Sequence, residues 1–418
     1  MISPQQAMSL AQARRGELVE LLSQLVAQRS HSGESARSAQ QVVLDYLSTL
    51  PYEIDCSFDS PSTLSAHEEF MPPLPEGDGP FVNVLARPLR RRESHSALFA
   101  HIDTHERADG WSRDPYQPVI QGGRLYGLGV ADGKGGVAAM LVAAAILHEA
   151  SAPAPVVICC HGKGGGSRGS LPVFSRMRAQ TPPLRAVAYA HPAETGRGLA
   201  DIKHVVRGAL DLSLHVRGWQ GGPLEIGLPE SALWSEGGDA LQKCLAVLDH
   251  LESTVLRPYD VNVGRLHAGS SVGAVPHEAT AELRVMFDDA RPWPDLFEEL
   301  QQSVSAYRSS SAPTKNDFHI ELKLGAMRSN AGATEWEAPA TRAVRDAIQE
   351  ITQHAPQSYP NHYNGDIRFP LRLLGVPAFG IGSVAGNFYG PDEWVDIDDL
   401  VRLVAVLVLT VCKWDQAA

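Results

Sequence analysis

The sequence predicts an α/β protein of two domains, and three observations support this prediction. At 418 residues the chain is long for a single hydrophobic core. Between residues 97 and 190, strand-like runs alternate with a small, apolar helix, which is typical of a mixed, mostly parallel sheet with covering helices. From about Gly208 the chain changes to alternating apolar and polar residues, which indicates half-exposed antiparallel strands.

The charge and the cysteines narrow the functional classes. A net charge of −12 argues against nonspecific nucleic-acid binding and against docking on an anionic membrane. The five cysteines are an odd number without a C-x-x-C pair, so we expect reduced thiols and a cytoplasmic location. The longest apolar run, Val404–Cys412, is too short to span a bilayer and predicts a core helix.

The first domain is expected to be discontinuous and to cover residues 1–207 and 325–418. Its helices are predicted at residues 8–29, 35–50, 137–148, 336–351 and 404–412. Its strands are predicted at residues 97–101, 155–160, 186–190 and 376–382. Residues 57–93 are rich in proline, glycine and charge and are expected to form an excursion ahead of the first of these strands.

The second domain is expected between residues 208 and 324. Strands are predicted at residues 209–216, 261–267, 279–287 and 318–324. Helices are predicted at residues 237–255 and 293–308. The resulting β-α-β-β-α-β order is that of a small ferredoxin-like α+β domain.

Polar residues at the end of the first predicted strand indicate a metal site. Alternation places His101 and Asp103 on the same face of the chain, while Ile102 points the other way. Asp132 follows in a glycine-rich turn ahead of a helix. Imidazole and carboxylate groups in such positions are suitable ligands for a divalent metal. A His-x-Asp pair by itself is more often a hydrogen-bonded pair on a loop.

The longer stretch around these residues resembles one enzyme family. It contains His101-Ile102-Asp103, then Trp111 with Asp114-Pro115-Tyr116, a turn from Gly123 to Gly127, and Asp132 to Gly136. This order closely resembles the signature of the acetylornithine deacetylase, succinyl-diaminopimelate desuccinylase and carboxypeptidase G family of zinc hydrolases. The resemblance extends from about residue 97 to the end of the chain. It implies a catalytic metallohydrolase domain and an inserted lid domain, through which a homodimer or higher homo-oligomer is expected.

Several positions depart from the family pattern. Lys163 and Gly164 stand where the family has a glutamate pair, of which the first is the general base and the second a metal ligand. Tyr389 stands where the family has its final metal-binding histidine. A lid histidine that helps stabilise the oxyanion would fall near Gly221-Gly222, and an expected asparagine falls at Gly273.

These departures imply one metal per chain. The set His101, Asp132 and His191 remains complete, with His191 at the position of a family glutamate, although a strand-end histidine bonded to backbone is the alternative. Two imidazoles and one carboxylate suit Zn²⁺, Mn²⁺ or Fe²⁺, and a second metal is not expected. Asp103 would orient His101.

The resemblance also suggests catalytic and substrate-binding residues. Lys163, His161 and Tyr389 are candidate proton acceptors, and Lys163 is alternatively a structural cation beside Asp132. Arg168, Arg284 and Arg368 could each hold a substrate carboxylate or serve as a structural ion-pair partner. Asp366 belongs with Arg368 to a segment similar to the family's Gly-x-Asp-x-Arg and is a further substrate-binding candidate.

The expected activity is hydrolysis of a carbon–nitrogen bond in a small carboxylated substrate by one metal-activated water. The bond would be an amide, or an amine on a ring as in the nitroanthranilate aminohydrolase branch of the family, whose single-metal pattern is similar. Two alternatives remain open. In the first, the chain is a catalytically dead homologue with a binding role. In the second, it is a conventional two-metal deacylase whose missing ligands come from Glu194, Asp366 or His362.

Overall fold

The computed structural model describes residues 2–32, 34–59, 64–71, 81–89, 93–161, 169–178, 184–218, 239–288, 291–310 and 318–416. The chain divides into two compact units. Unit 1 comprises Met1–Val206 and Gly332–Ala418, and unit 2 comprises Arg207–Ala331. The expected boundary after residue 324 lies inside a strand, because that strand continues to Ser329 before the chain leaves unit 2.

Unit 1 is built on a mixed sheet whose strands run in the order β1-β2-β6-β3-β7-β16 among the described residues. The strands are β1 (Tyr52–Asp59), β2 (Phe81–Pro88), β3 (Glu93–His101), β6 (Ala154–Cys160), β7 (Ala186–Ala190) and β16 (Ala378–Ile381). From β6 to β16 all neighbours are parallel, whereas β1 and β2 are antiparallel to their neighbours. The predicted mixed, mostly parallel sheet is therefore confirmed.

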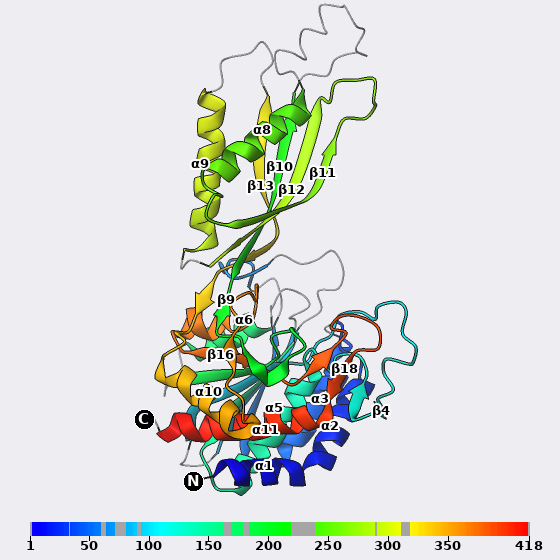
Figure 1. The fold of residues 1–418 in the computed structure, drawn as a ribbon, viewed down its shortest axis with the longest axis vertical. Coiled ribbons are helices and arrows are strands. Elements are labelled where there is room, and N and C mark those ends of the chain that lie inside the picture. The colour runs from blue at the N-terminus through cyan, green and yellow to red at the C-terminus, as the bar shows by residue number, and fades with distance from the viewer. Residues whose placement is uncertain are drawn as a thin grey trace, which may run out of the picture. The chain divides into compact units, whose positions relative to one another are not determined.

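The two faces of this sheet carry separate apolar clusters. Leu98 and Ala100 belong to the larger cluster, and Ala97 and Phe99 belong to the smaller one, as alternation along a strand requires. The larger cluster includes residues of α1 (Pro4–Ala13), α2 (Arg15–Ala27), α3 (Ala36–Ser48), α5 (Lys134–Glu149), α10 (Pro339–Thr352) and α11 (Ile397–Gln416). The smaller cluster includes residues of α6 (Ser170–Met177), and leucines of η3 (Pro370–Leu374) pack against it. Helices α5 and α11 pack side by side against β3 (Figure 1).

Shorter elements of unit 1 connect these layers. One small sheet has the order β17-β18-β5-β4 and is made of β4 (Val119–Gln121), β5 (Arg124–Tyr126), β17 (Ala385–Gly386) and β18 (Trp394–Asp396). Two pairs of short strands join β8 (Asp201–Ile202) to β15 (Gln357–Ser358) and β9 (Val205–Val206) to β14 (Gly332–Ala333). A helical turn, η1 (Gly198–Ala200), precedes β8.

Unit 2 is an antiparallel sheet with two helices. Its described strands are ordered β11-β12-β10-β13. The elements follow the chain as β10 (Gly208–Arg217), α8 (Ala240–Ser253), β11 (Asp260–Ala268), β12 (Glu278–Phe287), α9 (Trp293–Ser310) and β13 (His319–Ser329). The alternating burial of β12 reflects one face packed on the helices and one exposed face. The predicted β-α-β-β-α-β order and α+β class are confirmed.

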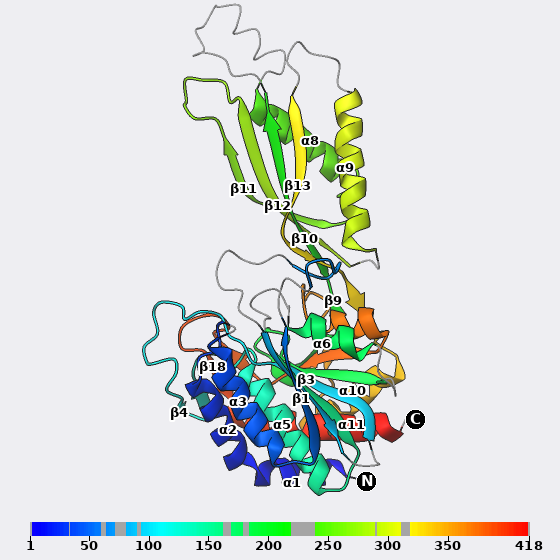
Figure 2. The ribbon, with the colours of Figure 1, turned by 180° about the vertical axis from the view of Figure 1, so that it is seen from behind.

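Two sequence predictions needed correction. Residues 57–93 contain the end of β1 and all of β2, and these two strands form the antiparallel edge of the main sheet (Figure 2). Charged residues on the exposed side of β1, such as Glu53 and Asp55, concealed this edge strand. The helix predicted at residues 8–29 is two helices, interrupted at Arg14. Among the described residues, no helix has the length and apolar character needed to cross a membrane.

Candidate metal centre

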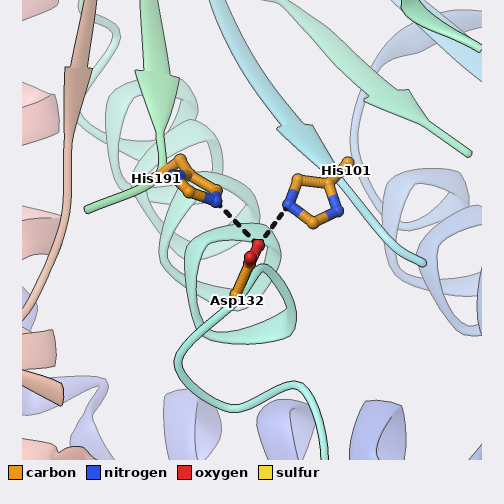
Figure 3. A group of neighbouring side chains, drawn as sticks. All are labelled: His101, Asp132 and His191. Carbon is orange, nitrogen blue, oxygen red and sulfur yellow. Dashed lines mark hydrogen bonds and ion pairs between the residues drawn. The ribbon is translucent and has the colours of Figure 1, made fainter. Parts of the chain in front are cut away.

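Three predicted metal ligands converge at the carboxyl edge of the main sheet. His101 is the last residue of β3 and His191 follows β7, and these two parallel strands are neighbours. Asp132 lies in the turn that leads into α5. Because the carboxyl ends of parallel strands meet at one edge, the two imidazoles face the same carboxylate (Figure 3). We call His101, Asp132 and His191 the metal triad.

The metal triad is compact and buried. The Nε2 atoms of His101 and His191 lie 2.6 Å and 2.7 Å from the Oδ1 atom of Asp132. One ligand atom from each residue lies within 4.8 Å of the others, and all three residues are buried. Within the described ranges, no second group of three or more histidine, cysteine or acidic side chains converges in this way.

The donor set fits a divalent metal. The Nδ1 atom of His101 lies 3.1 Å from the carbonyl oxygen of Asp103, and that of His191 lies 2.9 Å from the carbonyl oxygen of Pro192. A carbonyl oxygen accepts and does not donate, so each of these contacts favours the tautomer that has its proton on Nδ1 and its Nε2 lone pair toward Asp132. Two lone pairs and a carboxylate oxygen at these distances repel one another unless a cation lies among them. Two imidazoles and one carboxylate are suitable ligands for zinc, manganese or iron.

Lys203 lies behind His191 and was not anticipated from the sequence. Its side chain is fully buried, and its Nζ atom lies 2.5 Å from the Nδ1 atom of His191. The ring of Tyr189 stacks on the His191 imidazole, with ring centroids 4.9 Å apart and 11° between the two planes. An ammonium that donates to Nδ1 moves the imidazole proton to Nε2, whereas metal binding through Nε2 needs that proton on Nδ1. Lys203 therefore competes with the Pro192 carbonyl for control of the His191 tautomer.

Close backbone approach and one buried glutamate hold the turn that carries Asp132. A Cβ atom at Gly133 would lie 2.6 Å from the Nε2 atom of His101, so this position needs a glycine. Glu393 accepts hydrogen bonds from the backbone N–H groups of Gly129, Ala131 and Asp132. Burial raises the pKa of Glu393 to about 7 despite these bonds. Glu393, which directly precedes β18, therefore holds the Asp132 turn in place. Sequence spacing did not reveal this contact.

A second set of side chains lies beside the metal triad on its more exposed side. The Oε1 atom of Glu194 is 3.9 Å from the Nε2 atom of His191 and 4.0 Å from the Nδ1 atom of His362. Tyr389 lies close enough to Asp132 and Glu194 for both carboxylates to act on the pKa of its hydroxyl. The Glu194 side chain is 22% exposed and Tyr389 is 42% exposed. We call Glu194, His362 and Tyr389 the outer group.

Two residues of the outer group, Glu194 and Tyr389, have unusual backbone conformations. The φ angles of Glu194 and Tyr389 are 62° and 61°. For residues with large side chains, this left-handed region is sparsely populated and costs free energy. Burial, followed by the charges of Asp132 and Glu194, raises the pKa of Tyr389, so its hydroxyl stays protonated and donates.

The structure also locates the proposed proton acceptor His161 and the orienting residue Asp103. His161 follows β6 and is buried, and burial lowers its pKa, so the neutral imidazole is favoured. The charges of Asp103 and His101 also act on this pKa. The carboxylate of Asp103 lies 3.4 Å from the Nδ1 atom of His101, farther than its own carbonyl oxygen. Lys163 and Arg168 lie outside the described residues.

Asp366 and Arg368 form part of a buried ion network. The Arg368 side chain has no exposed surface and its Nε atom lies 3.3 Å from Glu69, while Asp366 accepts a hydrogen bond from Ser170. Arg372 binds the other carboxylate oxygen of Glu69 at 2.6 Å. In this arrangement neither Asp366 nor Arg368 reaches solvent. The contacts of Arg368 are those of a structural ion-pair partner, which was the alternative to a substrate role.

Arg284 lies in unit 2 and is engaged by a neighbouring strand. Its Nε and Nη2 atoms donate to the two carboxylate oxygens of Asp211 at 2.6 Å and 2.9 Å. This bidentate contact occupies the same face of the guanidinium that a substrate carboxylate would use. The structure thus brings together His101, Asp132, His191 and Tyr389, with His161 nearby, and it gives Arg284 and Arg368 carboxylate partners within the protein.

Comparisons with known proteins agree with this geometry. Residues 97–413 match the family described as Peptidase family M20/M25/M40. The chain is 25% identical over 336 residues to the succinyl-diaminopimelate desuccinylase of Zymomonas mobilis, covering 78% of this chain and 83% of the relative. It is 25% identical over 376 residues to the corresponding enzyme of Granulibacter bethesdensis, covering 88% of this chain and 94% of that relative.

Solved structures share the fold over nearly the full length. An M20 family metallo-carboxypeptidase from Sulfolobus solfataricus has a TM-score of 0.69 at 16% identity, covering 96% of this chain and 99% of its own. The aminopeptidase PepT of Bacillus cereus has a TM-score of 0.72 at 13% identity, covering 96% and 98%. A dinuclear metal-binding peptidase of Bacillus subtilis has a TM-score of 0.63 at 14% identity, covering 96% and 98%. This chain belongs to peptidase family M20/M25/M40, a family of metal-binding hydrolases, as its strand-end motifs predicted.

Proposed function

We propose that this protein hydrolyses an amide-type carbon–nitrogen bond in a small molecule and uses one divalent metal held by the metal triad. The observation that carries the proposal is the convergence of two Nε2 atoms on Asp132 while both Nδ1 atoms face carbonyl oxygens. This is the arrangement that metal-binding histidines need. Membership of the family supplies the hydrolase class.

His101, Asp132 and His191 would hold zinc, manganese or iron. When bound, such a metal supplies Lewis acidity, which polarises a carbonyl group and acidifies water near neutral pH. The protein supplies the remaining functions. The carbonyl oxygen of Asp103 favours the His101 proton on Nδ1, and that of Pro192 favours the same tautomer of His191 in competition with Lys203. The Tyr389 hydroxyl holds a proton next to Asp132.

The proton acceptor is the least constrained part of the mechanism. Tyr389 has a raised pKa and is better suited to donate a proton than to accept one. His161 has a lowered pKa and keeps a neutral imidazole that can accept a proton. We therefore favour His161 over Tyr389 among the described candidates. Lys163, outside the described residues, remains the third candidate.

The expected preference for a carboxylated substrate depends on three arginines. Arg284 and Arg368 are engaged by Asp211 and Glu69. A preference for a carboxylate therefore depends on Arg168 or on displacement of Asp211 from Arg284. We keep the carboxylated substrate as a proposal and include substrates with and without a carboxylate in its test.

A two-metal hydrolase is the second candidate, and one observation favours it. Glu194 and His362 were both named as replacement ligands, and the Oε1 atom of Glu194 lies 4.0 Å from the Nδ1 atom of His362. Asp366, the third named replacement, is buried in a separate ion network. The Bacillus subtilis structure of the same fold is a dinuclear metal-binding peptidase.

The test is metal-dependent hydrolysis. Chelator-treated protein is reconstituted with zinc, manganese or iron and assayed against dipeptides, N-acyl amino acids, and aromatic amines with and without a carboxylate. We expect hydrolysis of at least one amide class, saturating near one metal equivalent, and its loss in Asp132→Ala. Saturation at two equivalents would favour the two-metal candidate. Metal binding without turnover on any class would favour a catalytically dead homologue with a binding role.

We also propose a homodimer formed through unit 2 and a cytoplasmic location. Strand β11 is the edge of the sheet of unit 2, and its apolar residues Val263 and Leu266 are exposed. An exposed apolar edge strand favours pairing with a second copy. The free cysteines Cys56, Cys159, Cys160, Cys244 and Cys412 are consistent with a reducing compartment. Light scattering of the purified protein would test the dimer.

A further inference from the structure

A pocket lies in unit 1 between η1, the carboxyl end of α10 and the amino end of α11. Its volume is about 350 Å³. Small-molecule sites measure about 300–1,000 Å³, so the pocket is large enough for a small ligand. None of the described residues that line it belongs to the metal triad or the outer group. We call it the peripheral pocket. Its titratable lining residues are Arg197, His354, Asp399 and Arg402, and its apolar lining includes Leu199 and Ile351.

Two charged side chains of the peripheral pocket are engaged by the protein itself. Arg197 donates from Nε to the Asp201 carboxylate at 2.9 Å, and its Nη2 atom contacts the same carboxylate. Asp399 accepts the backbone N–H of Val384 at 2.7 Å, and its side chain is only 10% exposed. A Cβ atom at Gly198 would lie 2.7 Å from the Oδ2 atom of Asp399, so η1 packs directly against this carboxylate. Arg197 and Asp399 therefore form walls of the pocket and have little capacity left for a ligand.

Arg402 keeps its main binding edge available. Its Nη1 atom lies 3.3 Å from the Oδ1 atom of Asp399, and the described residues offer its Nε and Nη2 atoms no partner. Arg284 uses these same two atoms to hold Asp211 in unit 2, at 2.6 Å and 2.9 Å. This edge of a guanidinium binds a carboxylate or a phosphate through two parallel hydrogen bonds. Arg402 can therefore hold an oxyanion while it keeps its contact with Asp399.

His354 and two apolar side chains add to this preference. The backbone N–H and carbonyl of His354 bond with the Thr352 hydroxyl, and no described residue bonds with its ring nitrogens. An imidazole carries at least one N–H donor whether it is neutral or protonated. Leu199 and Ile351 provide apolar surface for the rest of a ligand. A cationic ligand would find only the Asp399 carboxylate, which is buried and already bonded.

We propose that the peripheral pocket is a binding site for a small molecule that carries a carboxylate or phosphate group. The Nε and Nη2 atoms of Arg402 hold the oxyanion, and His354 donates a further hydrogen bond to it. The apolar part of the ligand lies on Leu199 and Ile351. The site is separate from the metal triad and does not depend on the proposed hydrolysis.

The test measures binding of three probes by calorimetry on the zinc-loaded protein. Hydrocinnamate carries the carboxylate, phenyl phosphate carries the phosphate, and hydrocinnamyl alcohol is the neutral partner of the first probe. At least one anion should bind about 10- to 100-fold more tightly than the alcohol, the value of a charge-assisted hydrogen bond. The anion that binds more tightly identifies the group that the pocket selects. Equal binding of all three probes would overturn the proposal.

Two variants separate this pocket from the metal triad, because a bound metal also attracts carboxylates and phosphates. Arg402→Gln should remove the preference for the anion, and Arg402→Lys should keep part of it, since an ammonium retains the charge without the planar edge. Asp132→Ala, which lacks a proposed metal ligand, should keep the full preference. The reverse pattern, with the preference lost in Asp132→Ala and kept in Arg402→Gln, would overturn the proposal and place the anion on the metal.

A matched arginine controls for charge elsewhere on the surface. Arg265 in unit 2 is exposed and has one carboxylate partner, Glu282, at 3.0 Å. Arg265→Gln should bind the anionic probe as tightly as the unmodified protein does. Circular dichroism should show the same thermal unfolding for Arg402→Gln and Arg265→Gln, so that lost binding reports the site and not the fold. An equal loss of binding in both variants would reduce the effect to general surface charge and overturn the proposal.

Discussion

The metal triad and the outer group lie side by side but are built differently. His101 and His191 come from the ends of neighbouring parallel strands, are buried, and have their Nδ1 atoms set against backbone carbonyls. Glu194 and Tyr389 come from irregular segments, adopt left-handed backbone and remain partly exposed. Regular sheet geometry thus fixes the metal ligands, whereas the side chains that would meet the substrate depend on loops. This division allows substrate preference to change without loss of the metal site.

The largest expected effect separates these two regions. Asp132→Ala removes the carboxylate that both imidazoles face. Loss of a residue that only hydrogen-bonds a metal ligand lowers metal affinity by up to about 100-fold, so loss of this proposed ligand should lower it further. Tyr389→Phe removes only a hydroxyl from the outer group and should keep normal metal content. Competition with a fluorescent zinc chelator measures both. Equal metal loss in the two variants would show that the regions are not independent.

The next largest effect concerns an arginine expected to bind substrate. Arg368→Met leaves Glu69 and Asp366 buried without that cation, which should lower the free energy of unfolding by about 3–5 kcal/mol. The partly exposed pair of Arg284 and Asp211 provides the comparison, and Arg284→Ala should cost about 1 kcal/mol or less. Urea denaturation measures both values. A stable Arg368→Met protein with a raised KM would instead indicate a substrate role.

A smaller effect is expected behind the metal triad. Lys203→Met keeps the buried stem but removes the amine that lies 2.5 Å from the Nδ1 atom of His191. The Pro192 carbonyl then holds the Nδ1 proton without competition, and a positive charge no longer opposes the metal. Metal affinity should increase by about 10-fold, which is the smaller end of the changes caused by mutating residues that hydrogen-bond a metal-binding histidine. Weaker metal binding in this variant would show that Lys203 supports the site.

The smallest effect is expected at Asp103. The nearest acceptor for the His101 Nδ1 proton is the carbonyl oxygen of Asp103 at 3.1 Å, and its carboxylate is farther away at 3.4 Å. Asp103→Asn keeps the carbonyl, so metal affinity should fall by less than about 10-fold. Isothermal titration with zinc measures this change. A larger loss would mean that the carboxylate, and not the carbonyl, orients His101.

The sequence predicted those parts of the molecule that follow from regular periodicity. His101 ends the apolar run that forms β3, and His191 follows the apolar run that forms β7. Because β3 and β7 are parallel neighbours, the two histidines meet at the same edge of the sheet. Edge strands follow this rule less well, because one face is solvated and carries charges, as Glu53 and Asp55 do in β1.

The parts that could not be predicted depend on tertiary contacts of irregular segments. The contact of Lys203 with His191 requires the packing of β8 beside β16, which no local pattern encodes. The left-handed conformations of Glu194 and Tyr389 occur at residue types that do not favour them, so the sequence does not indicate which residue of each turn adopts a positive φ. The three hydrogen bonds of Glu393 to the Asp132 turn join residues about 260 positions apart in the chain and appear only in the structure.

The most direct test of the one-metal account is the number of metal ions per chain. Elemental analysis of the purified protein and of the His191→Ala variant would measure it. One equivalent in the unmodified protein, lost in the variant, is the result that the His101–Asp132–His191 site predicts. Two equivalents in the unmodified protein, or one equivalent retained in His191→Ala, would contradict that account.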